Sequence, residues 1–248
     1  MSCSVIVHRT SLMQAVGDRV RTGYRLYCTG TVTADRAASW VRKASRYYAV
    51  DLDRSRRARA KQRGEGCAYL LLHEDVPGLL VWVLLVTAGD HPAHQLERLR
   101  DVLDPAQRLE LFGYELVRLT KPGTCRPVWT WRMSALIYQA LRTRVIDTVR
   151  RGDTRAVRQL VVSLYRSAGF YGVRSQVGRA VALLKAEWRR RRGSEPLPHL
   201  PRILPYVRRL PIESVSLPVW LSAYAGATQS SKQIPPRPAD IATASPPI

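Results

Sequence analysis

The sequence predicts an α+β protein in which a small β-sheet is followed by a group of helices. Three observations lead to this class. Apolar and β-branched residues fill several short segments, apolar residues recur every three to four positions in others, and the two kinds of segment follow one another along the chain. With 46% hydrophobic residues, the 248-residue chain can bury the core of one large domain or two small ones.

Four strands and two helices are predicted in the first half of the chain. The first strand, YRLYCTGTVT, is aromatic and β-branched, and Thr33 or Asp35 can cap the helix that follows it. The strand LLVWVLLVT is apolar enough to be central and covered on both faces. In chain order, the predicted elements are a strand at 24–33, a helix at 33–50, strands at 67–73 and 79–87, a helix at 94–103 and a strand at 109–119.

The order strand, helix, strand, strand, helix, strand is that of the ferredoxin-like fold. Its four-stranded sheet leaves one face free of helices, and RNA-recognition domains bind nucleic acid on that face. We therefore expect a ferredoxin-like body over residues 1–133, with Gly113 as a possible bulge and a further short strand at 128–133.

Three helices are predicted next, at 134–150, 155–167 and 173–192. Between Arg132 and Arg192 the chain has fifteen Arg or Lys and three acidic residues, a net charge of +12 over 61 residues. A solvated helical surface normally mixes both signs, so the excess predicts a basic α-helical finger, 134–192, that lies against a phosphate backbone. The alternative is an exposed face whose arginine content reflects codon usage.

The remaining chain is expected to contribute little regular structure. A Pro-rich stretch at 193–205 marks a boundary, and 206–225 contains enough apolar residues to pack back on the body as a strand or an extended segment. We treat 193–225 as a return segment. The composition of 226–248, rich in Pro, Ser, Ala and Thr, is typical of a disordered tail.

The charge of the whole chain points to a polyanionic partner. Forty Lys+Arg against nineteen Asp+Glu give a net charge of +21, and most of the cations are arginines. A guanidinium group forms bidentate contacts with phosphate and stacks on bases, so nucleic acid is the simplest partner.

Several classes of protein are excluded. No apolar run approaches the roughly 18 residues of a membrane helix, and the first residues lack the pattern of a secretion signal, so we expect a cytoplasmic protein without a membrane partner. The motifs of nucleotide-hydrolysing and redox enzymes are missing, and the acidic residues are too scattered for a two-metal nuclease. We expect no cofactor.

Two sets of possible metal ligands have simpler explanations. Cys3, Cys28, Cys67 and Cys125 are far apart and form no CxxC pair, which favours structural thiols. Asp90, His91 and His94 could form a metal or acid–base site, but no third ligand is evident at a useful spacing. We favour a helix start at Pro92 and expect no metal.

The predicted RNA-binding residues are arginines, lysines and one tyrosine. RSRRARAKQR, at 54–63, is a basic arm that could clamp a phosphate backbone or remain a free loop. Aromatic residues next to arginines could stack on unpaired bases, although at least one of Trp129 and Trp131 is expected in the core. The candidates are Tyr24, Arg46, Arg54, Arg56, Arg57, Arg59, Lys61, Arg63, Arg150, Arg151, Arg155, Arg158, Arg166, Arg174, Lys185, Arg189, Arg190 and Arg192.

This layout resembles the endonucleases that process pre-crRNA in type IV CRISPR systems, members of the Cas RAMP superfamily. The resemblance covers about residues 24–210 and rests on the βαββαβ order, the basic helical appendage and the absence of a metal site or an obvious catalytic histidine. The chain departs from the wider group because it has no glycine-rich loop near its C-terminus and no complete second ferredoxin-like half.

The resemblance implies metal-independent cleavage beside a repeat stem-loop. The RNA 2′-hydroxyl would attack the adjacent phosphate, leaving a 2′,3′-cyclic phosphate and a 5′-hydroxyl, and the protein would stay bound to the mature crRNA with other Cas subunits of an effector complex. Arginines take the place of the usual histidine in that family. The candidate catalytic residues are Arg21, Arg25, Arg36 and Arg42, each of which could instead be a phosphate anchor or an ion-pair partner of Asp35.

Two other functions remain open. The protein could be a non-catalytic, plasmid-encoded DNA-binding accessory of replication or transfer, whose basic helices read duplex DNA. It could also be a structural component of an RNA–protein complex, which would bind RNA tightly and release no product.

Overall fold

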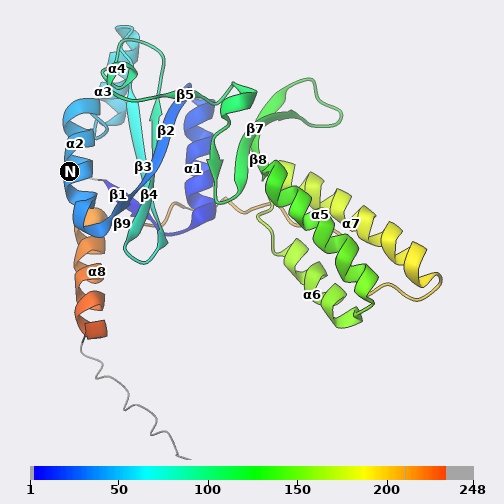
Figure 1. Ribbon diagram of the computed structural model, residues 1–248. Coiled ribbons are helices and arrows are strands. Elements are labelled where there is room, and N and C mark those ends of the chain that lie inside the picture. Colours follow the sequence, from blue (N-terminus) through cyan, green and yellow to red (C-terminus); the bar gives the residue numbers. More distant parts are fainter. Residues whose placement is uncertain (1–2, 210, 233–248) are drawn as a thin grey trace, which may run out of the picture.

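The structure is a computed structural model that describes residues 3–209 and 211–232, and it confirms the α+β class. This part of the chain contains eight α-helices, a mixed six-stranded sheet and a smaller three-stranded sheet (Figure 1). The elements are β1 (Ser4–Ile6), α1 (Arg9–Arg21), β2 (Leu26–Thr33), α2 (Ala34–Tyr48), α3 (Arg54–Gln62), β3 (Ala68–Val76), β4 (Leu79–Val86), α4 (Ala93–Leu96), β5 (Arg100–Asp101), the 3-10 helix η1 (Pro105–Gln107), β6 (Glu110–Leu111), β7 (Tyr114–Thr120), β8 (Pro127–Met133), α5 (Ala135–Arg151), α6 (Thr154–Tyr165), α7 (Tyr171–Arg192), β9 (Ser214–Ser216) and α8 (Leu217–Lys232).

The larger sheet has the strand order β5-β2-β4-β3-β1-β9. Its neighbouring strands are antiparallel except for β1 and β3, which run parallel. Leu70 and Leu84 pack in the core on one face, and Leu71 and Leu85 pack in the core on the other. Both faces of β3 and β4 are therefore buried, which explains why their sequences are nearly continuous apolar runs.

Helices cover both faces of this sheet (Figure 1). On one face lie α2, through Ala37 and Val41, and α8, through Trp220. On the other face α1 is packed between the larger sheet and the β6-β7-β8 sheet, and the indole N–H of Trp131 in β8 donates to the Met13 carbonyl of α1 at 2.8 Å. The expectation of an open sheet face for RNA is therefore wrong.

The sequence analysis did not predict β1 or α1. The buried side chains of α1 include Leu12, Met13, Val16 and Val20, which recur at helical spacing. These residues fill the space that an open sheet would leave to solvent. Residues of β1 and α1 are thus part of the core.

The predicted strand at 109–119 is two strands, and neither belongs to the larger sheet. Phe112 and Gly113 both have positive φ, 55° and 79°, and form the two-residue turn between β6 and β7. Left-handed backbone at both central positions is the geometry of a tight hairpin, so Gly113 marks a turn and not a bulge.

The predicted helix at 94–103 is also wrong beyond its first turn. After α4 the chain extends, because Arg100 and Asp101 pair with Leu26 and Tyr27 at the edge of the larger sheet. Val102 enters the core, whereas Leu96 and Leu103 remain exposed. Strand pairing has overridden an apolar pattern that would suit a helix.

The basic arm at 54–63 is largely the helix α3. The Asp53 carboxylate accepts the Arg56 backbone N–H at 2.7 Å and caps α3, and Ala60 packs into the core. Alanine and arginine are good helix formers, so the segment RSRRARAKQ is helical once its ends are anchored.

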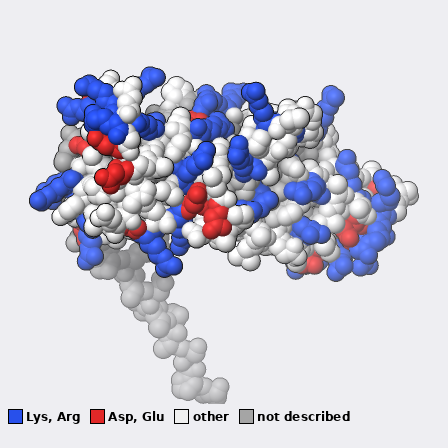
Figure 2. Space-filling view, turned by 90° about the horizontal axis from the view of Figure 1, so that it is seen from above, with Lys and Arg blue, Asp and Glu red and all other residues white. Residues whose placement is uncertain are grey.

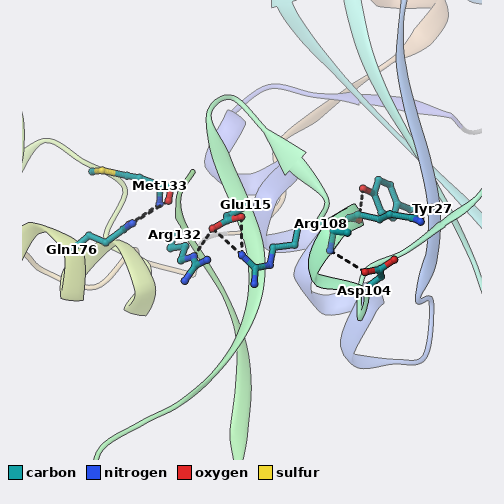
Figure 3. Close-up of polar contacts among 9 residues, drawn as sticks. Tyr27, Asp104, Arg108, Glu115, Arg132, Met133 and Gln176 are labelled. Atoms are coloured by element: carbon teal, nitrogen blue, oxygen red, sulfur yellow. Dashed lines mark hydrogen bonds and ion pairs between the residues drawn. The ribbon is translucent and has the colours of Figure 1, made fainter. Parts of the chain in front are cut away.

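The three helices predicted after β8 are present as α5, α6 and α7. They are joined to β8 through the buried Gln176, whose amide accepts the Met133 N–H at 2.7 Å and donates to the Met133 carbonyl at 3.0 Å (Figure 3). Asp153 caps α6 through two backbone N–H groups. These contacts attach the helices to the smaller sheet rather than leaving them on a free linker.

The return segment ends in a helix rather than an extended strand. β9 is only three residues long, and α8 begins directly after it with Leu217 and Pro218; Leu217 and Trp220 are buried against the body. Residues 226–232, expected in a disordered tail, belong to α8, and 233–248 lie outside the described residues. Within the described chain, no helix has both the length and the apolar composition needed to cross a membrane.

The start of α7 lies so close to β8 that only glycine fits at position 172. A Cβ on Gly172 would lie 2.5 Å from the Trp131 carbonyl oxygen. We expect Gly172→Ala to lower the free energy of unfolding by about 2 kcal/mol, because backbone atoms cannot move aside as a flexible side chain can. Urea denaturation measures this.

Gly178 in the same helix is the matched control, since a Cβ there meets nothing within 4 Å. We expect Gly178→Ala to raise the free energy of unfolding by about 0.5–1 kcal/mol, because alanine is the better helix former. Equal effects of the two substitutions would contradict the close approach of α7 to β8.

Candidate nucleic-acid interface

Cations dominate the face of the molecule shown in Figure 2. They crowd over the end that carries α3 and over the far end of the three helices, with others between them, and the acidic patches are fewer. The positive charge is therefore distributed along the molecule, and individual contacts decide which cations are available to a ligand.

One group of cations is stacked on tyrosine rings where α1, α3 and β3 meet. We call it the Tyr69 cluster, and its members are Arg19, Tyr24, Arg57, Lys61 and Tyr69. The Arg19 and Arg57 guanidinium carbons lie 3.9 and 4.7 Å from the centre of the Tyr69 ring. Lys61 Nζ lies 4.5 Å from the centre of the Tyr24 ring, which packs edge-on against Tyr69 at 6.3 Å.

The three cations of the Tyr69 cluster contact aromatic rings and backbone carbonyl groups. In the part of the chain that the structure describes, Arg19, Arg57 and Lys61 form no ion pair; Arg57 Nη2 donates to the Val50 carbonyl at 2.5 Å and Lys61 to the Thr22 carbonyl at 3.4 Å. Arg57 Nε is buried with no acceptor. Cations that are held in place and form no ion pair can contact an anionic ligand.

Tyr24 is a neutral support within the cluster. Burial raises the pKa of the Tyr24 hydroxyl, and the positive charges of Arg57 and Arg19 oppose that rise. The face of an aromatic ring attracts a cation through its quadrupole. Tyr24 therefore holds Lys61 in place rather than acting as an acid or base.

The cluster borders a cavity of about 580 Å³ between α1, α3 and β3. Arg19, Arg57 and Tyr69 line it, as do three carboxylates, Asp18, Asp51 and Asp53. Asp53 is committed to capping α3, and its hydrogen bond to the Arg56 N–H is the main reason that its pKa is lowered. The cavity thus combines fixed cations, an aromatic ring and carboxylate acceptors, a set that can contact both phosphate and base edges.

Two predicted RNA-binding residues, Arg57 and Lys61, come together in the Tyr69 cluster. The prediction for Tyr24 is wrong, because Tyr24 is 3% exposed and supports Lys61 from the core, where its ring cannot stack on a base. Sequence analysis missed Arg19 and Tyr69. Arg19 lies on helix α1, which the sequence analysis does not predict. Tyr69 lies in β3, a strand that is predicted from its apolar residues. A helix predicted from Leu12, Met13, Val16 and Val20 would have drawn attention to Arg19.

The other cations of α3 differ in availability. Arg54 and Arg59 are exposed and, among the described residues, have no ion pair. Arg56 pairs with Asp53 at 3.6 Å and Arg63 with Glu65 at 2.7 Å. The Arg46 guanidinium carbon on α2 lies 5.7 Å from the centre of the neighbouring Tyr47 ring. Arg46 is not part of the Tyr69 cluster, because α2 covers the opposite face of the sheet.

On the middle helix, three of the candidate RNA-binding arginines, Arg155, Arg158 and Arg166, lie together. These residues line one open cavity of about 510 Å³ along α6. Exposed cations that have no ion pair within the described chain also lie on the neighbouring helices, at Arg150, Arg151, Lys185 and Arg189. This is a second basic surface, separate from the Tyr69 cluster.

Three predicted RNA-binding arginines of α7 are held by the protein itself. Arg174 stacks on Tyr206 at 3.5 Å, and Arg190 pairs with Glu187. Arg192 donates to the Gly152 carbonyl at the end of α5 and pairs with Glu195. Part of the positive charge predicted for the finger is therefore used in contacts within the protein.

The Trp-Thr-Trp-Arg motif of β8 serves the core. Trp131 is almost fully buried, and Arg132 forms an ion pair with Glu115 of β7, which also pairs with Arg108 at 3.2 Å (Figure 3). This carboxylate, whose side chain is 12% exposed, is already satisfied by two guanidinium groups. Only Trp129, half-buried at the edge of a cleft, remains available to a ligand.

The four candidate catalytic arginines do not form one group. Arg25 precedes β2 and Arg36 follows it. Since a strand rises by about 3.3 Å per residue, the eight residues of β2 place its two ends about 26 Å apart. Arg21 lies on α1, while Arg36 and Arg42 lie on α2 across the sheet. Arg36 has the predicted contact with Asp35, at 3.9 Å, and Arg21 pairs with Asp18 at 3.4 Å.

The cysteines and histidines of interest differ in burial and contacts. All four cysteines are free thiols, and burial raises the pKa of the Cys28 thiol to about 12, which keeps it neutral. Pro92 directly precedes α4, as predicted. His91 is buried and hydrogen-bonds to the Tyr48 carbonyl and the Ala93 N–H, and His94 lies 3.2 Å from the Thr87 carbonyl.

Comparison with known proteins does not assign the chain to a family. No protein-family model matches it, no curated protein matches it, and no solved structure matches it. The function is therefore argued from the residues of this chain.

Proposed function

We propose that the protein binds structured RNA through the Tyr69 cluster and the basic surface of α6. The observation that carries the proposal is the set of three fixed cations, Arg19, Arg57 and Lys61, stacked on Tyr24 and Tyr69 without an ion pair in the described chain. Guanidinium groups on aromatic rings beside a cavity suit unpaired bases and their phosphates. The net charge of +21 supplies long-range attraction to a polyanion.

A hairpin RNA is a better fit than duplex DNA. The bases of B-form DNA are read by elements that enter a groove, and their faces are hidden in the stack. A hairpin offers a duplex stem for the arginines of α6 and unpaired nucleotides for the Tyr69 cluster. The proposed partner is a crRNA repeat hairpin, bound together with other Cas subunits, as the resemblance implies.

A competition experiment tests this proposal. We expect unlabelled hairpin RNA to displace a labelled hairpin at concentrations about tenfold or more below those of duplex DNA of equal length at the same salt, a difference of about 1.4 kcal/mol. Displacement by duplex DNA at equal or lower concentration would instead favour the DNA-binding accessory.

We also propose that the body of the protein has a ferredoxin-like fold. The chain order of that fold is matched by β2, α2, β3, β4, α4 and β5. In the sheet, the four strands lie side by side in the order β5-β2-β4-β3. In this proposal β1, β9 and α1 are additions at one edge and one face of the body. They move the RNA-binding surface from the sheet face to α1 and α3.

We propose further that the protein cleaves pre-crRNA by 2′-hydroxyl attack. Arg21 and Arg25 lie near the C-terminal end of α1, whereas Arg36 and Arg42 lie across the sheet, so one phosphate cannot meet both pairs. Arg21 is our choice because it lines a cleft beside α1. Its role would be to stabilise negative charge on the phosphate oxygens, since a guanidinium remains protonated and is a poor general base.

Incubation of repeat RNA with the protein in EDTA tests the cleavage. We expect a product with a 2′,3′-cyclic phosphate end, strongly slowed formation of it by Arg21→Ala and little change with Arg36→Ala. A cut that needs a divalent metal, or no cut at all, would contradict the cleavage and leave the RNA-binding proposal standing.

A further inference from the structure

A cleft of about 540 Å³ lies on the other side of α1 from the Tyr69 cluster. It is enclosed by α1, the β7–β8 hairpin, the start of α7 and the return segment, and we call it the α1–β8 cleft. Its volume falls within the range of about 300–1,000 Å³ that is typical of small-ligand sites in proteins. Asp18 of α1 lines both cavities, so the two are neighbours.

The walls of the α1–β8 cleft are held by hydrogen bonds within the protein. The Val207 N–H donates to the Gly169 carbonyl at 3.1 Å, and Gln14 of α1 donates to the Arg208 carbonyl at 3.0 Å. Arg21 Nη2 donates to the Trp129 carbonyl at 3.1 Å and joins α1 to β8. These bonds tie the return segment to α1 and the start of α7, so the cleft exists before a ligand enters.

The chemistry of the lining combines flat rings with positive charge. Trp129, Tyr171 and Tyr206 line the cleft together with three cations, Arg21, Lys121 and Arg209. Asp18, the one acidic residue of the lining, is paired with Arg21 and Arg209, which leaves a net charge of +2. Lys121 has no ion pair in the described chain and lies 5.7 Å from the Tyr171 ring.

Tyr206 is positioned for stacking on its outer side. The Arg174 guanidinium lies 3.5 Å from the centre of its ring, and Tyr206 is nevertheless 58% exposed. A ring fixed by a guanidinium on one side and open on the other is a stacking platform for a further planar group.

We infer that the α1–β8 cleft binds one unpaired nucleotide of the RNA, with its base against the aromatic rings and its phosphate near Lys121 and Arg21. This inference rests on the proposed RNA binding and adds the class of ligand. A paired base has both faces covered in the stack, so only an unpaired nucleotide at a loop or flank of the hairpin presents a face to Trp129, Tyr171 or Tyr206. The two cavities beside α1 would then hold neighbouring parts of one RNA.

Two RNAs that differ only in a single-stranded flank test the inference. We expect the wild-type protein to bind the flanked hairpin about tenfold more tightly than the blunt hairpin, because stacking of one base on aromatic side chains contributes an effect of this size. The variants are Lys121→Gln, on an exposed turn where folding is not at risk, and Trp129→Ala. We expect each variant to lose most of the advantage of the flank and to bind the blunt hairpin as the wild type does.

Two further results separate the possible failures. 2-Aminopurine in the flank should be quenched on binding to the wild type and less quenched by Trp129→Ala. If the flank gives no advantage in the wild type, or if both variants keep the full advantage, the inference is overturned while the proposed RNA binding stands. If neither RNA binds, the proposed function fails and this inference fails with it.

Discussion

The triple variant Arg19→Gln, Arg57→Gln, Lys61→Gln should bind hairpin RNA about 100-fold more weakly than the wild type at the same salt concentration. Each lost phosphate contact is worth about 1 kcal/mol, and three such contacts correspond to a factor of about 100 in Kd. Glutamine retains a hydrogen-bond donor toward the Val50 and Thr22 carbonyls that Arg57 and Lys61 contact. The expected loss is therefore one of charge rather than of local structure.

A second triple variant is the matched control. Arg42, Lys43 and Arg46 are exposed on α2, which covers the opposite face of the larger sheet, and their replacement by glutamine removes the same charge. We expect this variant to lose less than about fivefold in affinity, since it changes only the long-range field. Filter binding or fluorescence anisotropy measures both variants, with thermal unfolding to show that each is folded. The reverse ranking would place the RNA on the α2 side.

Trp131→Ala should lower the free energy of unfolding by about 4 kcal/mol, the largest stability effect that we expect from one substitution. Trp131 is 1% exposed, and its indole joins β8 to α1 through the Met13 carbonyl. The substitution would leave a cavity between the smaller sheet and α1 and an unsatisfied carbonyl in it. Because α1 also packs on the larger sheet, we expect the whole fold to melt in one transition.

Trp131→Phe separates the two contributions. Phenylalanine keeps most of the buried surface but cannot donate to Met13, and we expect a smaller loss of about 1–2 kcal/mol. Urea denaturation followed by circular dichroism measures both variants. A loss below about 1 kcal/mol for Trp131→Ala would contradict the packing of α1 between two sheets.

Sequence reasoning found the elements whose patterns are locally unambiguous. The strands β2, β3, β4 and β8 and the helices α2, α5, α6 and α7 lie close to their predicted places because apolar periodicity, caps and turn residues agree in each of them. It failed where long-range pairing decides the conformation. Residues 94–103 have a helical apolar pattern, yet Arg100 and Asp101 pair with β2, and no local signal reports a partner more than seventy residues away.

The candidate site was predicted in part for the same reason. The proximity of arginine, lysine and tyrosine in the sequence singled out Tyr24, Arg57 and Lys61, which meet in the structure. Arg19 and Tyr69 join them only because α1 and β3 pack together. Charge counting also overestimated the number of α7 arginines available to RNA. Arg174 contacts the return segment and Arg192 contacts the end of α5, and composition cannot report such contacts.

The salt dependence of hairpin binding tests the central claim most directly. The slope of log Kd against log salt concentration counts the phosphates that the protein neutralises, at about 0.7–0.9 per contact. We predict that the Arg19, Arg57 and Lys61 variant has a slope smaller than that of the wild type by about 2, and that the α2 variant keeps the wild-type slope within about 0.5. Equal slopes for the wild type and the Tyr69-cluster variant would show that these three cations do not contact the RNA backbone, and would contradict the account.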